Sequence, residues 1–155
     1  MKLTIIIPSF NEAENLESLL SSLKQFVASK EYEVILVNDA STDDSLTILE
    51  QKNKGNWFSL ISNKVNRGYG GSIKEGIKEA KGEYVITVDA DGQHNLYDIE
   101  KLYNYILENN ADMVIGSRDD SSSSLIRQIG KSVIRKIAKI LMPITIHDIN
   151  SGMKI

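Results

Sequence analysis

The sequence of 155 residues contains no cysteine, two prolines and two histidines. Without cysteine the chain forms neither disulfide bridges nor thiolate metal sites, and no cysteine can act as a nucleophile. The two histidines, His94 and His147, do not form a spaced metal-binding pair. No apolar run approaches the roughly 20 residues that span a bilayer, and the run near Met1 is too short for a signal peptide.

The remaining composition is that of an ordinary globular domain, with 41% hydrophobic and 25% charged residues. The length is sufficient for one domain with a sizeable core. The net charge of −3 is unevenly distributed, because residues 1–120 carry −8 and residues 121–155 carry +5. An acidic body with a basic end indicates either a charged partner surface or a solvated helix face.

Apolar and β-branched runs alternate with stretches of helical periodicity. Strands are predicted at 3–7, 33–38, 57–62, 83–88 and 112–115, and helices at 11–29, 41–51, 70–80, 96–108 and 125–141. Asn11 is the expected N-cap of the first helix, with Glu14 completing a capping box. The alternation predicts an α/β fold with an open, mostly parallel, Rossmann-like sheet and helices on both faces.

Ligands of such sheets bind beyond the carboxyl ends of the strands. Polar residues follow the first, second, fourth and fifth predicted strands, in the segments 8–12, 38–43, 89–94 and 116–118. Helix capping accounts for Asn11, Ser41 and Asp43. It accounts less well for the three acids Asp39, Asp89 and Asp91.

Asp89 and Asp91 stand two residues apart after a buried strand, and Gly92 permits a turn that lets the carboxylates converge. Hard divalent cations take oxygen ligands, and Mg²⁺ usually bridges substrate phosphates, so a metal with a diphosphate explains this acidic pair. The alternative is a surface turn rich in Asp and Gly.

The sequence does not match the motifs of other nucleotide-binding folds or of serine hydrolases. Ile73 replaces the third glycine of a dinucleotide motif, Ile77 replaces the lysine of a phosphate loop, and the chain has no nucleophile elbow.

Six segments together form an ordered series of motifs: 6–12, 37–43, 66–71, 89–93, 116–118 and 148–154. In order and spacing this series resembles glycosyltransferase family 2, and within it the dolichol-phosphate mannosyltransferase-like and polyprenyl-phosphate glycosyltransferases. The resemblance implies the nucleotide-diphospho-sugar transferase fold, a UDP- or GDP-linked sugar donor, Mg²⁺ or Mn²⁺ as cofactor, and an inverting single displacement. Met153 stands where the family most often has Phe.

The resemblance also implies roles for individual residues. The donor would be bound by Pro8, Ser9, Glu12, Asp39, Asp89, Ala90 and Asp91. The metal would be held by Asp89, Asp91 and Gln93. The residues expected to take part in catalysis are Asp91, Arg118, Arg127 and Asp148.

The acceptor is expected to be a polyprenyl phosphate or a glycan precursor. Arg118 and Arg127 match arginines that would contact a lipid phosphate, because guanidinium groups bind phosphate in a bidentate manner. A hydroxyl acceptor would instead need a general base, for which Asp148 is the candidate.

The predicted helix 125–141 presents Arg127, Lys131, Arg135 and Lys139 every four residues beside an apolar side. Such a helix is suited to an anionic membrane surface, so we expect a cytoplasmic protein at the inner face of the cell membrane. The alternative is a helix that packs on the domain or is covered by further chain.

We therefore expect one catalytic domain over 1–155, with donor and metal sites in 1–120 and the start of an acceptor-side part in 121–155. We expect no nucleic-acid partner. The absence of any end signal after Ile155 favours a C-terminally truncated fragment. Two other hypotheses are a nucleotide-sugar-binding domain that is inactive as a fragment, and a Mg²⁺-dependent haloacid-dehalogenase-like phosphatase.

Overall fold

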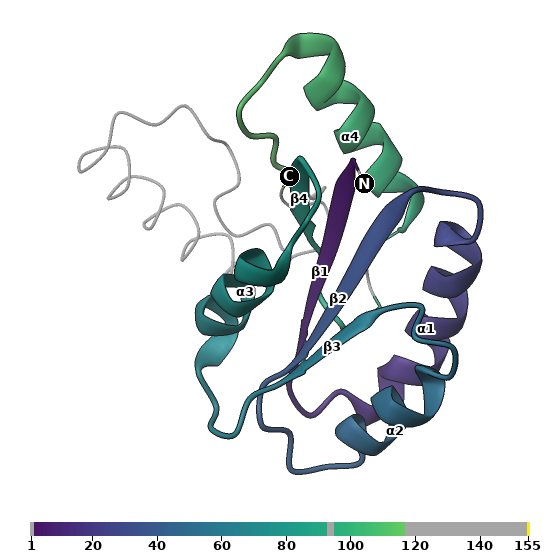
Figure 1. Cartoon of the computed structure of the whole chain (residues 1–155), viewed down its shortest axis with the longest axis vertical. Helices are drawn as coiled ribbons and strands as arrows, with labels where there is room; N and C mark the ends of the chain where they lie inside the picture. The colour runs from purple at the N-terminus through teal and green to yellow at the C-terminus, as the bar shows by residue number, and fades with distance from the viewer. Residues whose placement is uncertain (1, 93–94, 117–154) are drawn as a thin grey trace, which may run out of the picture.

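The computed structural model describes residues 2–92, 95–116 and 155. Its four parallel strands are β1 (Leu3–Ser9), β2 (Tyr32–Asn38), β3 (Ser59–Ser62) and β4 (Tyr84–Thr87), in the order β3-β2-β1-β4. The helices are α1 (Ala13–Val27), α2 (Ser45–Lys52), α3 (Gly68–Glu79) and α4 (Tyr97–Asn109). Helices α1, α2 and α3 each return the chain to the start of the next strand, as parallel pairing requires, and α4 follows β4 (Figure 1).

The helices cover both faces of the sheet (Figure 1). On one face, alternate β1 residues such as Leu3 and Ile5 join a buried cluster with Leu16 of α1, Leu49 of α2 and Ile99 of α4. On the other face lies a smaller cluster made by Ile6, Ile35 and Val37. Helix α3 contacts β1 and β2 on its way from β3 to β4. The predicted Rossmann-like α/β architecture is confirmed.

The predicted fifth strand at 112–115 does not join this sheet in the described part of the chain. Val114 instead exchanges two backbone hydrogen bonds with Ile155, at 2.8 and 3.0 Å. Among the described residues, 112–115 has one bridge, at Ile115, and no strand. The predicted fifth strand stays a prediction, because residues 117–154 lie outside the described part of the chain. Ile155 is 8% exposed and packs into the larger core cluster.

The third strand is shorter than predicted because its first two residues pack elsewhere. Trp57 donates its indole N–H to the carbonyl of Lys52 at 2.9 Å, at the end of α2. Its ring lies edge-on to that of Phe58, with centroids 4.8 Å apart, and Phe58 is buried in the core. Both aromatic side chains therefore secure the α2–β3 connection, and regular pairing begins only at Ser59.

The predicted helix 125–141 and the loop at 121–124 lie outside the described residues. Among the residues that are described, no helix is long and apolar enough to cross a membrane.

The contact between α3 and β1 can be tested at Gly76, which is buried in α3. A Cβ atom at this position would lie 2.6 Å from Cγ2 of Ile6 and 3.1 Å from its Cδ1. Gly76→Ala should therefore lower the free energy of unfolding by about 1–3 kcal/mol through overpacking. Urea denaturation of both proteins measures this difference.

Gly70→Ala is the matched control, because a Cβ atom at Gly70 in the same helix meets nothing within 4 Å. It should leave stability unchanged or raise it by up to about 1 kcal/mol, as alanine favours helices over glycine. Equal losses of stability in the two variants would refute the close packing of α3 on β1.

Candidate functional site at the carboxyl ends of the strands

The strand order places a switch point between β1 and β4, since the chain moves outward through β2 and β3 and then returns to the other side of β1. Pairing of β1 with β2 continues to Ser9 and Asn38, but pairing with β4 ends at Ile6 and Thr87. The Ile6 carbonyl still accepts the Val88 N–H at 3.0 Å. Two residues further on, Pro8 has no N–H to continue this ladder. The sheet therefore opens between β1 and β4 at the edge where ligands of such folds bind.

The loops after β1 and β2 are tied to each other by hydrogen bonds. The Asn11 side chain accepts the Thr42 N–H at 2.8 Å, and the Asn11 N–H donates to Ser41 Oγ at 3.1 Å. Asn11 has a φ of 55°, a left-handed conformation that asparagine tolerates better than most residues. The prediction that Asn11 caps α1 is therefore wrong, because its side chain caps the neighbouring loop instead.

The N-terminus of α1 is capped from the second loop. The Ala13 N–H donates to Asp43 Oδ2 at 3.1 Å, and the Glu12 N–H donates to Ser45 Oγ at 2.9 Å. Burial raises the pKa of the Asp43 carboxyl, but hydrogen bonds from Ser45 and Ala13 outweigh burial and lower it below the ordinary value. These hydrogen bonds fix the two loops as one wall of the candidate site.

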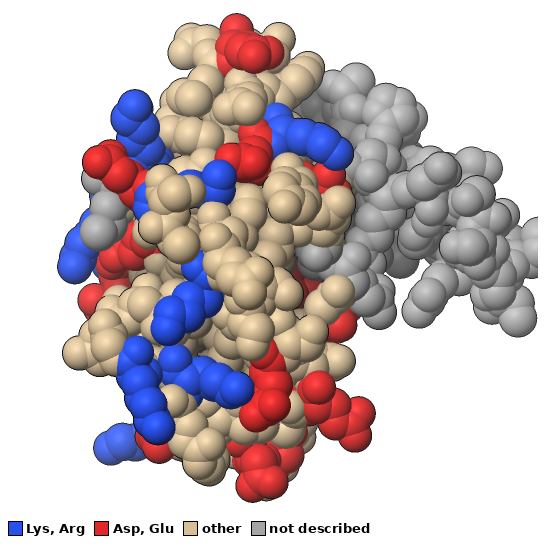
Figure 2. Space-filling model, turned by 90° about the vertical axis from the view of Figure 1, so that its right-hand side faces the viewer, with Lys and Arg blue, Asp and Glu red and all other residues tan. Residues whose placement is uncertain are grey.

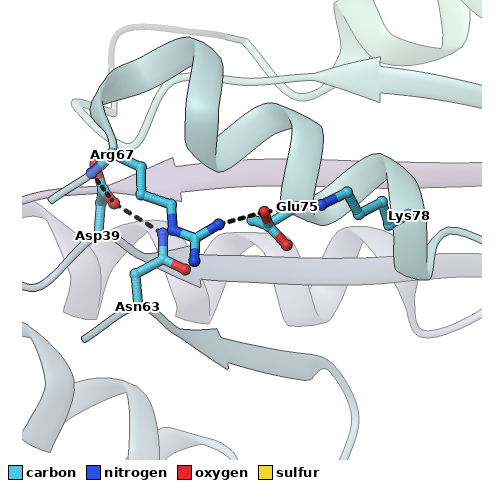
Figure 3. Close-up of polar contacts among 5 residues, drawn as sticks. All are labelled: Asp39, Asn63, Arg67, Glu75 and Lys78. Atoms are coloured by element: carbon cyan, nitrogen blue, oxygen red, sulfur yellow. Dashed lines mark hydrogen bonds and ion pairs between the residues drawn. The ribbon is translucent and has the colours of Figure 1, made fainter. Parts of the chain in front are cut away.

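Asp39 lies directly after β2 and is only 3% exposed. Its Oδ1 accepts hydrogen bonds from Asn63 Nδ2 at 2.8 Å and from the Arg67 backbone N–H at 2.9 Å, and the same N–H lies 3.1 Å from Oδ2 (Figure 3). Burial by itself raises the pKa of the Asp39 carboxyl, but these hydrogen bonds favour the carboxylate and lower the pKa below its ordinary value. The carboxyl end of β2 is therefore followed by a buried carboxylate that is ionised at neutral pH.

Asn63 and Arg67 were missed as partners of Asp39 by the sequence reasoning. Asn63 directly follows the last residue of β3. The predicted site residues follow the other three strands of the sheet, and none was predicted at the end of β3. Its backbone N–H donates to the Asn38 carbonyl at 2.9 Å, so the β3 end is aligned with the β2 end. The same rule that pointed to Asp39 could have found Asn63.

Asp89 and Asp91 follow β4, with the buried Ala90 between them and Gly92 at a φ of 70° after them. Asp89 Oδ1 accepts a hydrogen bond from the Tyr69 hydroxyl at 3.0 Å. Tyr69 belongs to the first turn of α3, so this helix start contacts the acidic turn as well as the Asp39 side of the site. Sequence reasoning did not identify Tyr69, because nothing local links positions 20 residues apart.

The donor set of the acidic turn suits a hard cation. Two carboxylates are fewer than a closed protein site, and the described residues contain no group of three or more His, Cys, Asp or Glu that could hold a metal. Mg²⁺ and Mn²⁺ ordinarily keep water and phosphate oxygens in their coordination shell, so the chemistry of Asp89 and Asp91 fits such an ion.

The other described candidates lie at the carboxyl end of β1. Pro8 and Ser9 are its last two residues, while Glu12 is the N-cap residue of α1 and accepts a hydrogen bond from Asn15 Nδ2 at 2.7 Å. Ser9 Oγ is buried and has no hydrogen-bond partner among the described residues, and the same is true of Oδ1 of Asn38, the residue paired with Ser9. Buried polar atoms without partners call for water or a ligand. The candidates Gln93, Arg118, Arg127 and Asp148 lie outside the described residues.

Comparison with known proteins gives the family. The sequence model of the family described as "Glycosyl transferase family 2" matches residues 4–152. This chain therefore belongs to glycosyltransferase family 2, as the motif series predicts. A family match of this extent gives no support to the phosphatase hypothesis.

Three relatives illustrate the range of the family. The chain is 39% identical to a poly(ribitol-phosphate) beta-glucosyltransferase of Bacillus spizizenii, over 75% of this chain and 19% of that protein. It is 35% identical to a dolichol-phosphate mannosyltransferase of Pyrococcus furiosus, over 76% of this chain and 33% of that protein. The solved mannosyltransferase PcManGT of Pyrobaculum calidifontis, in complex with GDP-Man and Mn²⁺, superposes with a TM-score of 0.68 at 21% identity. That superposition covers 78% of this chain and 36% of the other.

The chain thus spans about a fifth to a third of the length of these two curated relatives. The likeness to the solved mannosyltransferase supports the fold.

The buried Asp39 carboxylate can be tested by its effect on stability. Asp39→Asn should lower the free energy of unfolding at neutral pH by about 1–3 kcal/mol, because the amide presents a donor to the Arg67 N–H. Since folding lowers the pKa of Asp39, its contribution is present above the unfolded-state pKa of about 4 and is lost as pH falls through the lower folded-state pKa. Urea unfolding between about pH 7 and pH 2.5 should show a smaller loss of stability on acidification in the variant.

Asp112→Asn serves as the matched control, because Asp112 is exposed and lies away from the strand ends. This variant should keep the pH dependence of the wild type. The assignment of Asp39 fails if Asp39→Asn also keeps it unchanged.

Proposed function

We propose that this chain carries the donor-binding part of a metal-dependent, inverting glycosyltransferase that uses a UDP- or GDP-linked sugar. One observation carries the proposal. In a chain of this family, the ionised Asp39 and the acidic pair Asp89 and Asp91 lie at the carboxyl ends of β2 and β4, on either side of the end of β1. A nucleoside diphosphate has a polar base and ribose at one end and an anionic diphosphate at the other, so its two ends can be assigned to the two sides of β1.

The nucleoside end is assigned to the β1–β2 side. Pro8, Ser9, Glu12 and Asp39 would line the pocket, with the carboxylate of Asp39 accepting a hydrogen bond from the base or the ribose. Each carboxylate oxygen has two lone pairs, so a carboxylate that already accepts protein hydrogen bonds keeps capacity for a ligand donor. The unpartnered Oγ of Ser9 supports a ligand group at this place.

The diphosphate end is assigned to the turn after β4. Asp89 and Asp91, together with Gln93, would hold Mg²⁺ or Mn²⁺, and Ala90 would contact the donor between them. When bound there, the ion would supply Lewis-acid stabilisation of the negative charge on the leaving nucleoside diphosphate. Tyr69 lies in the first turn of α3, and the hydrogen bond from its hydroxyl orients the Asp89 carboxylate. The complex of PcManGT with GDP-Man and Mn²⁺ supports this cofactor class.

The acceptor is proposed to be a polyprenyl phosphate or a glycan precursor, as the names of the two curated relatives suggest. For a phosphate acceptor, Arg118 and Arg127 would bind its oxygens, and the anion needs no general base. For a hydroxyl acceptor, Asp148 would take the proton. Inversion follows if the acceptor attacks the anomeric carbon from the face opposite the leaving diphosphate.

The metal assignment can be tested by nucleotide binding. Asp91→Ala should weaken Mn²⁺-dependent binding of UDP or GDP by at least about tenfold, because one of two carboxylate ligands is removed. Isothermal titration with and without the ion measures the dependence. Asp112→Ala removes an exposed acid and should bind as the wild type does. If Mn²⁺ still strengthens binding in Asp91→Ala, the metal lies elsewhere.

The membrane assignment rests on the sequence of the basic end. Figure 2 shows both signs of charge on the face that carries α1 and α2, with acidic side chains gathered at its lower end. The loops at this end of the sheet contain Glu12, Asp43 and Asp44. Because charges of both signs are mixed on this face, it offers anionic lipid no uniformly basic surface, and the proposed contact with the inner face of the cell membrane is assigned to residues 121–155.

Replacing Lys131, Arg135 and Lys139 with Glu should abolish sedimentation with vesicles that contain about 30% phosphatidylserine, since each basic residue near such a surface contributes about 1 kcal/mol.

The control introduces the same charge change on the described body, at Lys52, Lys54 and Lys64. This control should sediment like the wild type. Loss of binding in both variants, or in neither, would refute a membrane contact made by the basic stripe.

A further inference from the structure

A cluster of charged side chains on α3 has no role in the functions assigned above. Arg67 Nη1 donates to Glu75 Oε1 at 2.5 Å, and Lys78 Nζ reaches the same oxygen at 3.0 Å. The Glu75 side chain is 23% exposed and lies between its two partners along the helix (Figure 3). Arg67 immediately precedes α3, so the cluster begins at the edge of the candidate site.

Arg67 joins two carboxylates by different parts of the residue. Its backbone N–H lies within hydrogen-bonding distance of both oxygens of Asp39, while its guanidinium is held by Glu75. The side chain reaches Glu75 by passing over the first turn of α3 beside Gly71. A Cβ atom at Gly71 would lie 2.6 Å from Cβ of Arg67. The path of the Arg67 side chain therefore depends on the absence of a side chain at Gly71.

Glu75 carries the negative charge that an ion pair with Arg67 requires. The hydrogen bond from Lys78 and the charges of Lys78 and Arg67 lower the pKa of the Glu75 carboxyl, so it is ionised at neutral pH. An ion pair with so exposed an arginine adds little to global stability. Holding the guanidinium nevertheless restricts the torsions of Arg67, whose N–H contacts the buried Asp39. Loss of the Glu75–Arg67 ion pair should therefore loosen Arg67 locally without a large change in the free energy of unfolding, and the two effects can be measured separately.

We propose that Glu75 is a positioning residue for the nucleoside pocket. By holding the guanidinium of Arg67, it keeps the Arg67 N–H on Asp39 and so keeps this carboxylate oriented for the nucleoside. This inference rests on the proposed function, because it assumes that Asp39 binds the nucleoside. Glu75 itself touches no ligand in this arrangement.

A double-mutant cycle on the 155-residue chain tests the proposal, with Glu75→Ala, Arg67→Ala and the double variant. Each single variant should raise the Kd for UDP or GDP in the presence of Mn²⁺ by about three- to tenfold, the scale of one modest polar interaction. The double variant should bind no more weakly than either single variant, because both remove the same restraint. Thermal midpoints should change little. Lys78→Ala is the matched control, since it removes the other partner of Glu75, and it should leave Kd unchanged.

A second measurement does not need a ligand. In the free protein, hydrogen exchange at the Arg67 amide reports its hydrogen bond to Asp39. Glu75→Ala should accelerate this exchange about three- to tenfold, whereas Lys78→Ala should not. Unchanged exchange in Glu75→Ala would overturn the proposal even if nucleotide binding were altered.

The remaining outcomes are equally decisive. Wild-type Kd in Glu75→Ala overturns the positioning role, and tighter binding would mean that Glu75 withholds Arg67 from the nucleotide. A loss confined to Arg67→Ala would make Arg67 a direct ligand contact. If the wild type binds neither UDP nor GDP, the proposed function fails, while faster exchange in Glu75→Ala would still show that Glu75 fixes the Arg67 N–H.

Discussion

The burial of a charged carboxylate at the end of β2 is the constraint on which the arrangement of this site depends. An unpaired carboxylate at 3% exposure would be costly, and Asp39 is stabilised only because donors from a distant segment reach it. Those donors, Asn63 and the Arg67 N–H, both come from the connection between β3 and α3. Asp39 therefore fixes how the β3–α3 connection lies over the strand ends, and with it where α3 begins.

From this start, α3 links the two halves of the site. Its first turn carries Tyr69, which contacts Asp89 beyond β4. Arg67, the residue just before the helix, contacts Asp39 beyond β2. The helix spans this distance because it crosses β2 and β1 between the edge strand β3 and β4 on the other side. Close packing of Gly76 on Ile6 holds the helix against the sheet. The separation between the two acidic positions is thus a consequence of the crossover.

Local patterns predicted the strands well, because buried parallel strands appear as continuous apolar runs such as Leu3–Ile7. They also predicted Asp39, Asp89 and Asp91, since polar residues after such runs stand out. Patterns failed where the partner is distant in sequence. Asn11 is a residue type typical of helix caps, yet its side chain accepts the N–H of Thr42, 31 residues away. Trp57 has the β-propensity of a strand residue but packs against the end of α2. Tyr69 lies in the motif segment 66–71, but no local pattern predicts its hydrogen bond to Asp89, 20 residues away.

The topology also sets the direction in which a donor would lie. Pairing between β1 and β4 stops at Ile6 and Thr87, and Pro8 prevents the ladder from continuing, so the sheet is open between these strands. A donor with its nucleoside beside Asp39 and its diphosphate beside Asp89 and Asp91 would cross the end of β1 at this opening. Its sugar would then lie beyond the turn after β4. The proposal that residues 1–120 bind the donor agrees with this direction, because the nucleoside and the diphosphate would both be met by the described strand ends.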